Sequence, residues 1–302
     1  MAGQTQPDGM RRAAAAEGAR EPRESFFKRA NVDLRVSLGA LAILVLLLLA
    51  VFVPLWAEPE SQSIGDVLAT RLLPPGTRDA SGGWHVLGTD AFGRDMFVRL
   101  WVAARVSLLV GIVGSALSGA VGIALGALAG WFGGSADRII VAVSDAMLAI
   151  PRLILLIVIA ALWGPGMGVV IVVLGLTGWM SVMRLVRAEV QQRRHEAFVE
   201  GAIALGIPTP RLLSLHVLPN SLDGASVAIT LGVGNAILLE SGLSFLGLGI
   251  QPPAASWGNM IAGGREWLLT APWVALTPGI LLIVSVVACT MLGEGLRDRG
   301  RV

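Results

Sequence analysis

Four long stretches of this chain contain no acidic or basic side chain, and this leaves few folds open to it. These stretches run between Arg35 and Glu58, Arg105 and Asp137, Arg152 and Arg184, and Glu266 and Glu294. A helix that crosses a bilayer needs about 20 predominantly apolar residues, because each residue rises about 1.5 Å through a hydrocarbon core about 30 Å thick. Charged residues make up only 15% of the chain. The pattern predicts an all-α integral membrane protein.

Six segments have the length and apolarity of membrane spans. They cover residues 36–56, 104–131, 139–162, 168–188, 222–248 and 272–293, in approximate bounds. The first is interpreted as a retained anchor helix, because it is longer than the apolar region of a cleaved signal. The organisation expected is therefore a mobile tail at 1–30, a first helix with an outer loop at 31–101, and a five-helix core at 102–302 that carries a loop at 189–221.

The placement of arginine and lysine predicts the orientation of these spans. An even number of spans puts both chain termini on one side, together with the loop at 189–221. That side would hold sixteen of the basic residues and the other side six. Because cytoplasmic loops carry the excess of basic residues, we expect a multi-pass protein of the inner (plasma) membrane with cytoplasmic N- and C-termini.

The second span carries small residues at a continuous spacing of four, at Gly114, Ser118, Gly122, Gly126 and Gly130. This spacing places them on one face of a helix, where they let two helix backbones approach closely. The face is predicted to pack against another helix of this chain or of a partner, and the alternative is that it lines a substrate path.

The loop at 189–221 is too apolar for a free loop and too interrupted to span the membrane. We expect a helix from about His195 to Leu205 that ends at Gly206, a residue that tolerates the left-handed conformation of a C-terminal cap. Thr209 would cap a second short helix, with Pro210 in its first turn, that ends before Pro219.

One face of the first of these helices is apolar. Phe198, Ala202 and Leu205 share that face, with Val199 and Ile203 beside them. Such a helix needs an apolar groove, either in its own chain or on another protein. The alternative is an amphipathic helix that lies at the membrane surface without a partner.

The same loop resembles the EAA loop of ABC-importer permeases. The residues that carry the resemblance are Glu200, Gly201, Ala202, Gly206, Leu218 and Pro219. In that family the short helix docks into a cleft of a cytoplasmic ATPase and couples its closure to movement of the membrane helices. Gly201 stands where alanine is usual, which costs about 1 kcal/mol of helix propensity but removes only a methyl group.

Four further segments resemble the dipeptide, oligopeptide and nickel permeases within that family. They are 87–95 (LGTDAFGRD), 244–249 (SFLGLG), 257–259 (WGN) and 293–298 (GEGLRD). The matches keep their order from about residue 30 to the C-terminus and indicate the C-type member of a permease pair. Arg152 departs from the pattern, because an apolar or small residue more usually follows the proline at 151.

This resemblance implies the type I importer permease fold, with about six transmembrane helices. The chain would form half of a pathway for dipeptides or oligopeptides. Its partners would be a second homologous permease, two ATP-binding cassette ATPases, an extracytoplasmic substrate-binding protein and membrane lipid.

The chain itself has no motif for catalysis. A P-loop needs a lysine in a glycine-rich loop, and the only lysine, Lys28, stands in none. We therefore expect a non-catalytic subunit without a cofactor, with ATP and Mg²⁺ bound by the partner ATPases. His85, His195 and His216 are too scattered to predict a metal site, and a net charge of +2 gives no indication of nucleic-acid binding.

Three ionisable residues fall inside the predicted spans and are candidates for the translocation path, because charges in hydrocarbon usually face a cavity or each other. They are Asp145, Arg152 and Glu240. Asp145 and Arg152 are seven residues apart and would share a helix face. Arg152 and Glu240 could meet peptide termini, or these residues could form internal ion pairs. A competing class, the ion-coupled secondary transporters, would be expected to carry internal repeats, and we find no convincing repeat here.

Overall fold

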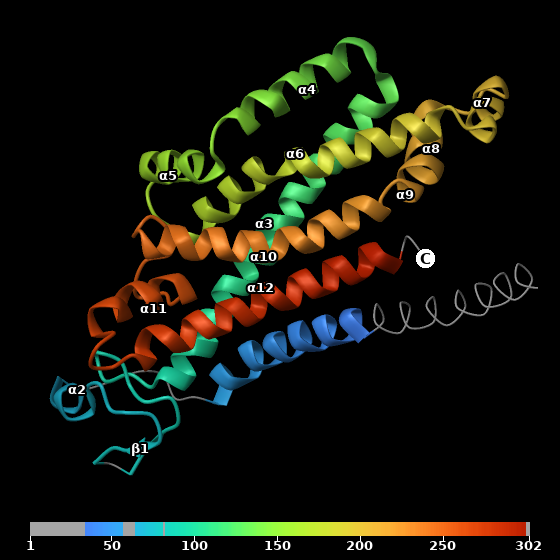
Figure 1. The fold of residues 1–302 in the computed structure, drawn as a ribbon. Coiled ribbons are helices and arrows are strands. Elements are labelled where there is room, and N and C mark those ends of the chain that lie inside the picture. Colours follow the sequence, from blue (N-terminus) through green and yellow to red (C-terminus); the bar gives the residue numbers. More distant parts are fainter. Residues whose placement is uncertain (1–33, 57–63, 81, 300–302) are drawn as a thin grey trace, which may run out of the picture.

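The computed structural model describes residues 34–56, 64–80 and 82–299, which form a bundle of long helices (Figure 1). The predicted tail at residues 1–30 lies outside these described residues. In chain order the elements are the helix Leu34–Trp56, α2 (Ile64–Thr70), β1 (Thr77–Arg78), β2 (Trp84–His85), α3 (Met96–Phe132), α4 (Gly134–Ala149), α5 (Arg152–Trp163), α6 (Met167–Arg194), α7 (Ala197–Ala204), α8 (Thr209–Leu212), a π-helical turn (Leu213–Val217), α9 (Leu218–Asn220), α10 (Asp223–Phe245), α11 (Trp257–Gly264), a 3₁₀ turn (Arg265–Trp267) and α12 (Trp273–Arg299).

Five of the described helices are long and apolar enough to cross a bilayer. They are the helix Leu34–Trp56, α3, α6, α10 and α12. The consecutive helices α4 and α5 pass the same test only together, and they are bent by 88° with respect to each other. The prediction of an all-α membrane protein with about six spans is confirmed.

The third predicted span, 139–162, is wrong as a single helix. Ile150 has extended backbone angles, φ −93° and ψ 127°, and it separates α4 from α5. A residue before proline is pushed out of the helical region by the proline ring, so Pro151 explains the break. The expected shared face of Asp145 and Arg152 does not exist, because these residues belong to different helices.

The helix α3 begins at Met96, well before the predicted boundary near residue 104. Asp95 caps it, since its carboxylate accepts a hydrogen bond from the backbone N–H of Val98. At 37 residues the helix is about 55 Å long, which exceeds a hydrocarbon core of about 30 Å. It therefore reaches from the end of the bundle that carries the antiparallel hairpin of β1 and β2, called the hairpin end below, to the opposite end (Figure 1).

Small residues of α3 lie against α6 along most of the bundle. A Cβ atom added to Gly122 would lie 2.8 Å from the backbone oxygen of Trp179, and one added to Gly126 would lie 2.7 Å from that of Met183. Gly130 meets the backbone of α6 in the same way at its next turn. The two helices therefore touch backbone to backbone, which only residues without a side chain allow.

Gly114 and Ser118 continue the same contact toward the hairpin end. A Cβ atom added to Gly114 would lie 3.2 Å from the Cβ of Leu174. Ser118 lies opposite Gly178 of α6, and a Cβ atom added to Gly178 would lie 3.1 Å from the Cβ of Ser118. All five members of the spaced series thus face α6.

The first helix runs beside the last one. A Cβ atom added to Gly39 would lie 2.8 Å from the backbone nitrogen of Leu292, and one added to Gly295 would lie 2.5 Å from Val36. The beginning of the helix Leu34–Trp56 and the end of α12 are therefore at the same end of the bundle (Figure 1).

Candidate functional site

The segment that follows α6 projects from the bundle. Figure 1 shows α7 beyond the end of α6, at the end of the molecule where α12 terminates. The hairpin, α2 and α11 lie at the opposite end (Figure 1). A surface made by α7 is thus accessible to a partner that approaches the bundle from this end.

One side of α7 packs on the core of its own chain. Val199 is fully buried in an apolar cluster with Trp131 of α3 and with Val186 and Val190 of α6. Ala202 is half-buried against the same cluster. The chain thus supplies part of the groove that the apolar helix needs.

Three other apolar side chains of this segment are about half exposed or more. Leu205 is 85% exposed, and Phe198 and Ile203 are about half exposed, at 50% and 49%. The predicted common face of Phe198, Ala202 and Leu205 is therefore divided, because Ala202 turns toward the core. An exposed apolar group of this kind at the end of a projecting helix is typical of a protein-binding surface.

The local structure of the loop differs from the prediction at three places. The first helix is shorter, Ala197–Ala204, although the chain does turn at Gly206, with φ +77°. Thr209 does not cap the second helix; Pro208 stands at its N-cap position, without a side-chain hydrogen bond. The helix also continues past the expected stop at Pro219, because a π-helical turn accommodates the missing N–H of the proline.

The residues of the EAA-like pattern fall into two groups. Glu200, Gly201, Gly206 and Pro219 are exposed. Ala202 and Leu218 are half-buried, and both pack against the cluster around Val199. The pattern thus combines residues that hold the loop to the bundle with residues that face outward.

Arg152 lines a cavity of about 330 Å³ between α3, α5, α6 and α10, and also an adjoining cavity of about 180 Å³. Its Nε donates to Thr177 Oγ1 at 3.3 Å, and its Nη2 donates to the backbone oxygen of Leu174 at 3.2 Å. Both acceptors are neutral. Of the three charged candidates for the path, Arg152 alone lines these two cavities.

Asp145 and Glu240 have other surroundings. The side chain of Asp145 is 57% exposed and forms an ion pair with Arg184 of α6. Glu240 is fully buried, and its carboxylate accepts hydrogen bonds from Ser107, Ser241 and Ser244. The alternative of an internal ion pair thus describes Asp145, whereas Glu240 holds a network of hydroxyl groups that the sequence analysis did not identify.

A second ion pair between α4 and α6 was also missed. Asp137 accepts hydrogen bonds from both Nε and Nη2 of Arg187. Asp137 ends one apolar run and Arg187 lies three residues beyond the end of another, but nothing in their sequence separation of 50 residues indicates that they meet. Together with the pair of Asp145 and Arg184, this contact fixes α4 along α6.

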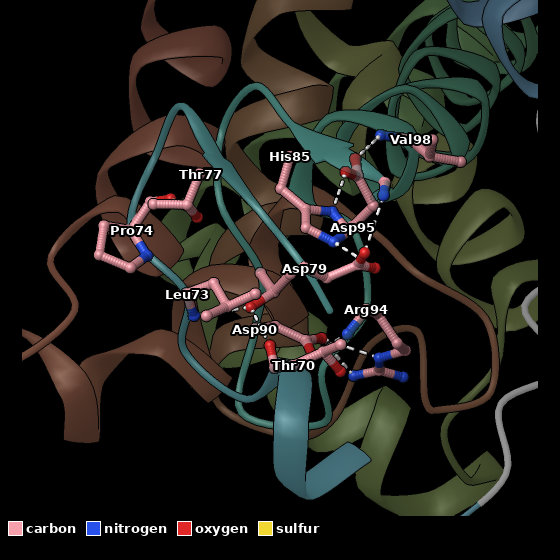
Figure 2. Close-up of polar contacts among 12 residues, drawn as sticks. Thr70, Leu73, Pro74, Thr77, Asp79, His85, Asp90, Arg94, Asp95 and Val98 are labelled. Carbon is pink, nitrogen blue, oxygen red and sulfur yellow. Dashed lines mark hydrogen bonds and ion pairs between the residues drawn. The ribbon is translucent and has the colours of Figure 1, made fainter. Parts of the chain in front are cut away.

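The LGTDAFGRD segment folds into a closely hydrogen-bonded turn at the hairpin end (Figure 2). Asp90 accepts from the backbone N–H of Phe92 at 2.8 Å and of Arg94 at 3.0 Å, and it also binds the Arg94 side chain. His85 lies between two carboxylates, with Asp95 at 2.7 Å and Asp79 at 3.4 Å. The motif therefore ties the hairpin to the cap of α3.

Two glycines of this segment adopt backbone angles that other residues rarely adopt. Gly88 has φ +75° and Gly93 has φ +74°. A Cβ atom added to Gly88 would lie 2.4 Å from the backbone oxygen of Leu73, and one added to Gly93 would lie 2.2 Å from Thr70 Oγ1. Both conformation and space therefore require glycine at these positions of the motif.

Comparison with known proteins shows similarity to membrane subunits of transport systems. A family model described as "Binding-protein-dependent transport system inner membrane component" matches residues 122–299. The oligopeptide transport system permease protein OppC of Bacillus subtilis is 34% identical over 260 residues, which cover 86% of this chain and 83% of the relative. A putative peptide permease of Brucella suis is 40% identical over 268 residues, which cover 87% of this chain and 86% of the relative.

Two further proteins extend the comparison. The dipeptide transport system permease protein DppC of Alkalihalophilus pseudofirmus is 37% identical over 279 residues, which cover 92% of this chain and 88% of the relative. A solved chain of the MetNI methionine ABC transporter, in an inward-facing conformation, aligns with a TM-score of 0.52 at 19% identity. The alignment covers 67% of this chain and 97% of the solved chain, so the two share a fold.

Proposed function

This chain belongs to the family of binding-protein-dependent transport system inner membrane components, and from that membership we propose that it forms half of the membrane pathway of an ATP-driven peptide importer. As a permease subunit of an ABC importer, it is a multi-pass membrane protein without catalytic activity of its own. Relatives that cover most of its length are named as oligopeptide and dipeptide permeases, which supports peptides as the substrate class.

We propose that a partner ATPase binds the exposed apolar side chains in and directly after α7, and that ATP hydrolysis acts on this chain through this contact. Val199 anchors α7 to the bundle, while Leu205, Phe198 and Ile203 are left uncovered. A partner ATPase that binds these three side chains would press directly on the cluster formed by α3 and α6. We assign ATPase docking to the outward-facing residues of the EAA-like pattern, Glu200, Gly201, Gly206 and Pro219, and attachment to the bundle to Ala202 and Leu218.

The orientation proposed for the chain places α7 in the cytoplasm. The end of α12 and the beginning of the helix Leu34–Trp56 lie at the α7 end of the bundle, so both termini would be cytoplasmic. The opposite end, with the hairpin and α11, would face an extracytoplasmic substrate-binding protein. ATP and Mg²⁺ would be bound by two ATPase subunits, and a second homologous permease would complete the pathway in the inner membrane.

The substitution Leu205→Arg tests the docking surface. Leu205 is 85% exposed, so an arginine there does not disturb the fold of the chain. Loss of an apolar anchor from an interface typically costs about 2 kcal/mol or more, which corresponds to about thirtyfold weaker binding. We expect the tagged permease to lose the ATPase subunits on purification in mild detergent, and ATP-dependent peptide uptake in proteoliposomes to fall at least tenfold.

Val86→Arg is the matched control for this test. Val86 is 56% exposed and directly follows β2, which belongs to the hairpin at the end of the bundle opposite α7. It should leave both ATPase retention and the membrane level of the chain unchanged. If Leu205→Arg kept the ATPases and normal uptake, α7 would not be the docking element, and the coupling proposal would be abandoned.

A further inference from the structure

The charge of Arg152 is not neutralised by any acidic side chain that the structure describes. Both acidic residues of α4 are engaged elsewhere, Asp137 with Arg187 and Asp145 with Arg184. Glu240 is enclosed by serine hydroxyls. Within the part of the chain that the structure describes, Arg152 therefore carries an uncompensated positive charge among membrane helices, where an unpaired charge is costly.

The guanidinium also has free hydrogen-bonding capacity. It carries five N–H donors in a planar arrangement, and its hydrogen bonds to Thr177 and Leu174 use two of them. The Thr177 hydroxyl donates in turn to the backbone oxygen of Val173 at 2.7 Å, so it acts toward Arg152 only as an acceptor. The side chain is thus held in place by two neutral groups while donors remain for a ligand.

The space beside Arg152 suits a polar ligand. The larger cavity, of about 330 Å³, is also lined by Ser115, Ser118, Ser181 and Asn235. Arg152 is the only ionisable residue among those that line either cavity. A ligand in this space therefore meets one positive charge, neutral hydroxyl and amide groups, and apolar side chains such as Leu174 and Val182, but no carboxylate from the lining residues.

Gly178 keeps this arrangement open. A Cβ atom added to it would lie 2.5 Å from Ser118 Oγ and 2.8 Å from Arg152 Nη2. The absence of a side chain at this position lets the guanidinium and the serine hydroxyl approach each other across α6. Ser118 is close to the middle of α3, so the half-buried guanidinium lies at about mid-length of this membrane helix.

We propose that Arg152 is a carboxylate-binding residue of the membrane cavity, which makes this permease select for substrates with a free carboxylate group. The inference rests on the proposed function and specifies its substrate class. A guanidinium binds a carboxylate through two parallel N–H···O hydrogen bonds, and such pairs are stronger than hydrogen bonds between neutral groups. The carboxyl terminus of a peptide or an acidic side chain provides this group, whereas an amino terminus finds no acidic partner among the residues that line the cavity.

The test measures the charge preference of the cavity directly. Ser181, which is exposed and lines both cavities, is replaced by cysteine in a Cys289→Ala background, within the complete complex of permeases and ATPases. The thiol is labelled with an anionic reagent, sulfonatoethyl methanethiosulfonate, and with a cationic one, trimethylammonioethyl methanethiosulfonate. With Arg152 present, we expect the ratio of anionic to cationic labelling rates to be about tenfold higher than with Arg152→Gln, since the charge attracts one reagent and repels the other. Arg152→Lys, which keeps the charge, should restore most of the ratio.

A second measurement leaves Arg152 in place and does not depend on the stability of its variants. Saturating trialanine should slow the labelling of Ser181→Cys more than trialanine amide, which lacks the carboxylate. The proposal is overturned if Arg152→Gln leaves the ratio of labelling rates unchanged, or if the acid and the amide protect equally. Labelling needs no ATP turnover. A complex with the expected charge preference that imports no peptide would therefore contradict the proposed function alone, and an active importer without that preference would contradict this inference alone.

Discussion

Gly126→Val is expected to prevent the chain from accumulating as a folded membrane protein. Even the Cβ atom of an alanine at this position would lie 2.7 Å from the backbone oxygen of Met183 and 2.8 Å from the Cβ of Val186. Backbone atoms of α6 cannot move aside as a flexible side chain can, so α3 and α6 would have to separate. Overpacking of a tight core typically costs about 1–3 kcal/mol, and we expect a cost at or above the upper end of this range, because valine adds three carbon atoms against backbone.

Gly168→Val is the matched control, because it makes the same chemical change in α6 at a glycine where an added Cβ atom meets nothing within 4 Å. Both substitutions replace glycine by valine within a helix, a change that helix propensity slightly favours, so a loss seen only with Gly126→Val reports the contact between α3 and α6. The measurements are the amount of monodisperse protein after detergent extraction and its midpoint of thermal unfolding. Equal amounts and equal midpoints for the two variants would show that these helices do not form the rigid contact described above.

Glu240→Ala is expected to cause the second largest loss of stability, in the half of the bundle near the hairpin. The carboxylate accepts from Ser107 at 3.0 Å and from Ser244 at 2.7 Å. These hydroxyls accept in turn from the backbone N–H of Trp257 at 3.2 Å and of Ile250 at 2.9 Å. One buried carboxylate thereby joins α3 and α10 to the chain that leads into α11.

Alanine would leave these buried hydroxyls without their acceptor and would open a cavity. Each unpaired buried group costs about 1–3 kcal/mol, so the total free energy lost is several kcal/mol. Glu240→Gln keeps the shape and one acceptor oxygen, and we expect it to retain most of the stability. The measurements are the unfolding midpoint and the rate of proteolysis between residues 246 and 257. If the alanine and glutamine variants were equally stable, the serine network would not hold these helices together.

Properties that depend on neighbouring residues in the chain could be predicted from the sequence. The apolar runs identified five long helices, because each contains enough apolar residues to cross a bilayer by itself. The spacing of four in α3 identified the face that meets α6, since residues four apart share a face on any helix. Gly206 was identified as a turn because only glycine adopts its φ of +77° without strain.

The sequence was misleading where one residue interrupts a regular pattern. The sequence predicted one continuous helix across Pro151, in which Asp145 and Arg152 would share a face. The bend of 88° at this point separates them, so that Asp145 meets Arg184 and Arg152 reaches Thr177. A proline indicates that a helix is disturbed, but the direction that the chain then takes depends on the helices packed around it.

The partners of the charged residues were decided only by the tertiary structure. In the sequence, Arg152 and Glu240 are alike, since each is a charge within an apolar run. In the fold, serines from two helices enclose Glu240, whereas Arg152 faces a cavity without an acidic neighbour. The sequence by itself thus determined that this chain spans the membrane. It also determined which face of α3 carries the small residues that allow close packing. Which buried charge is satisfied and which remains open to a ligand depends on contacts between residues far apart in the chain, and only the folded structure brings these together.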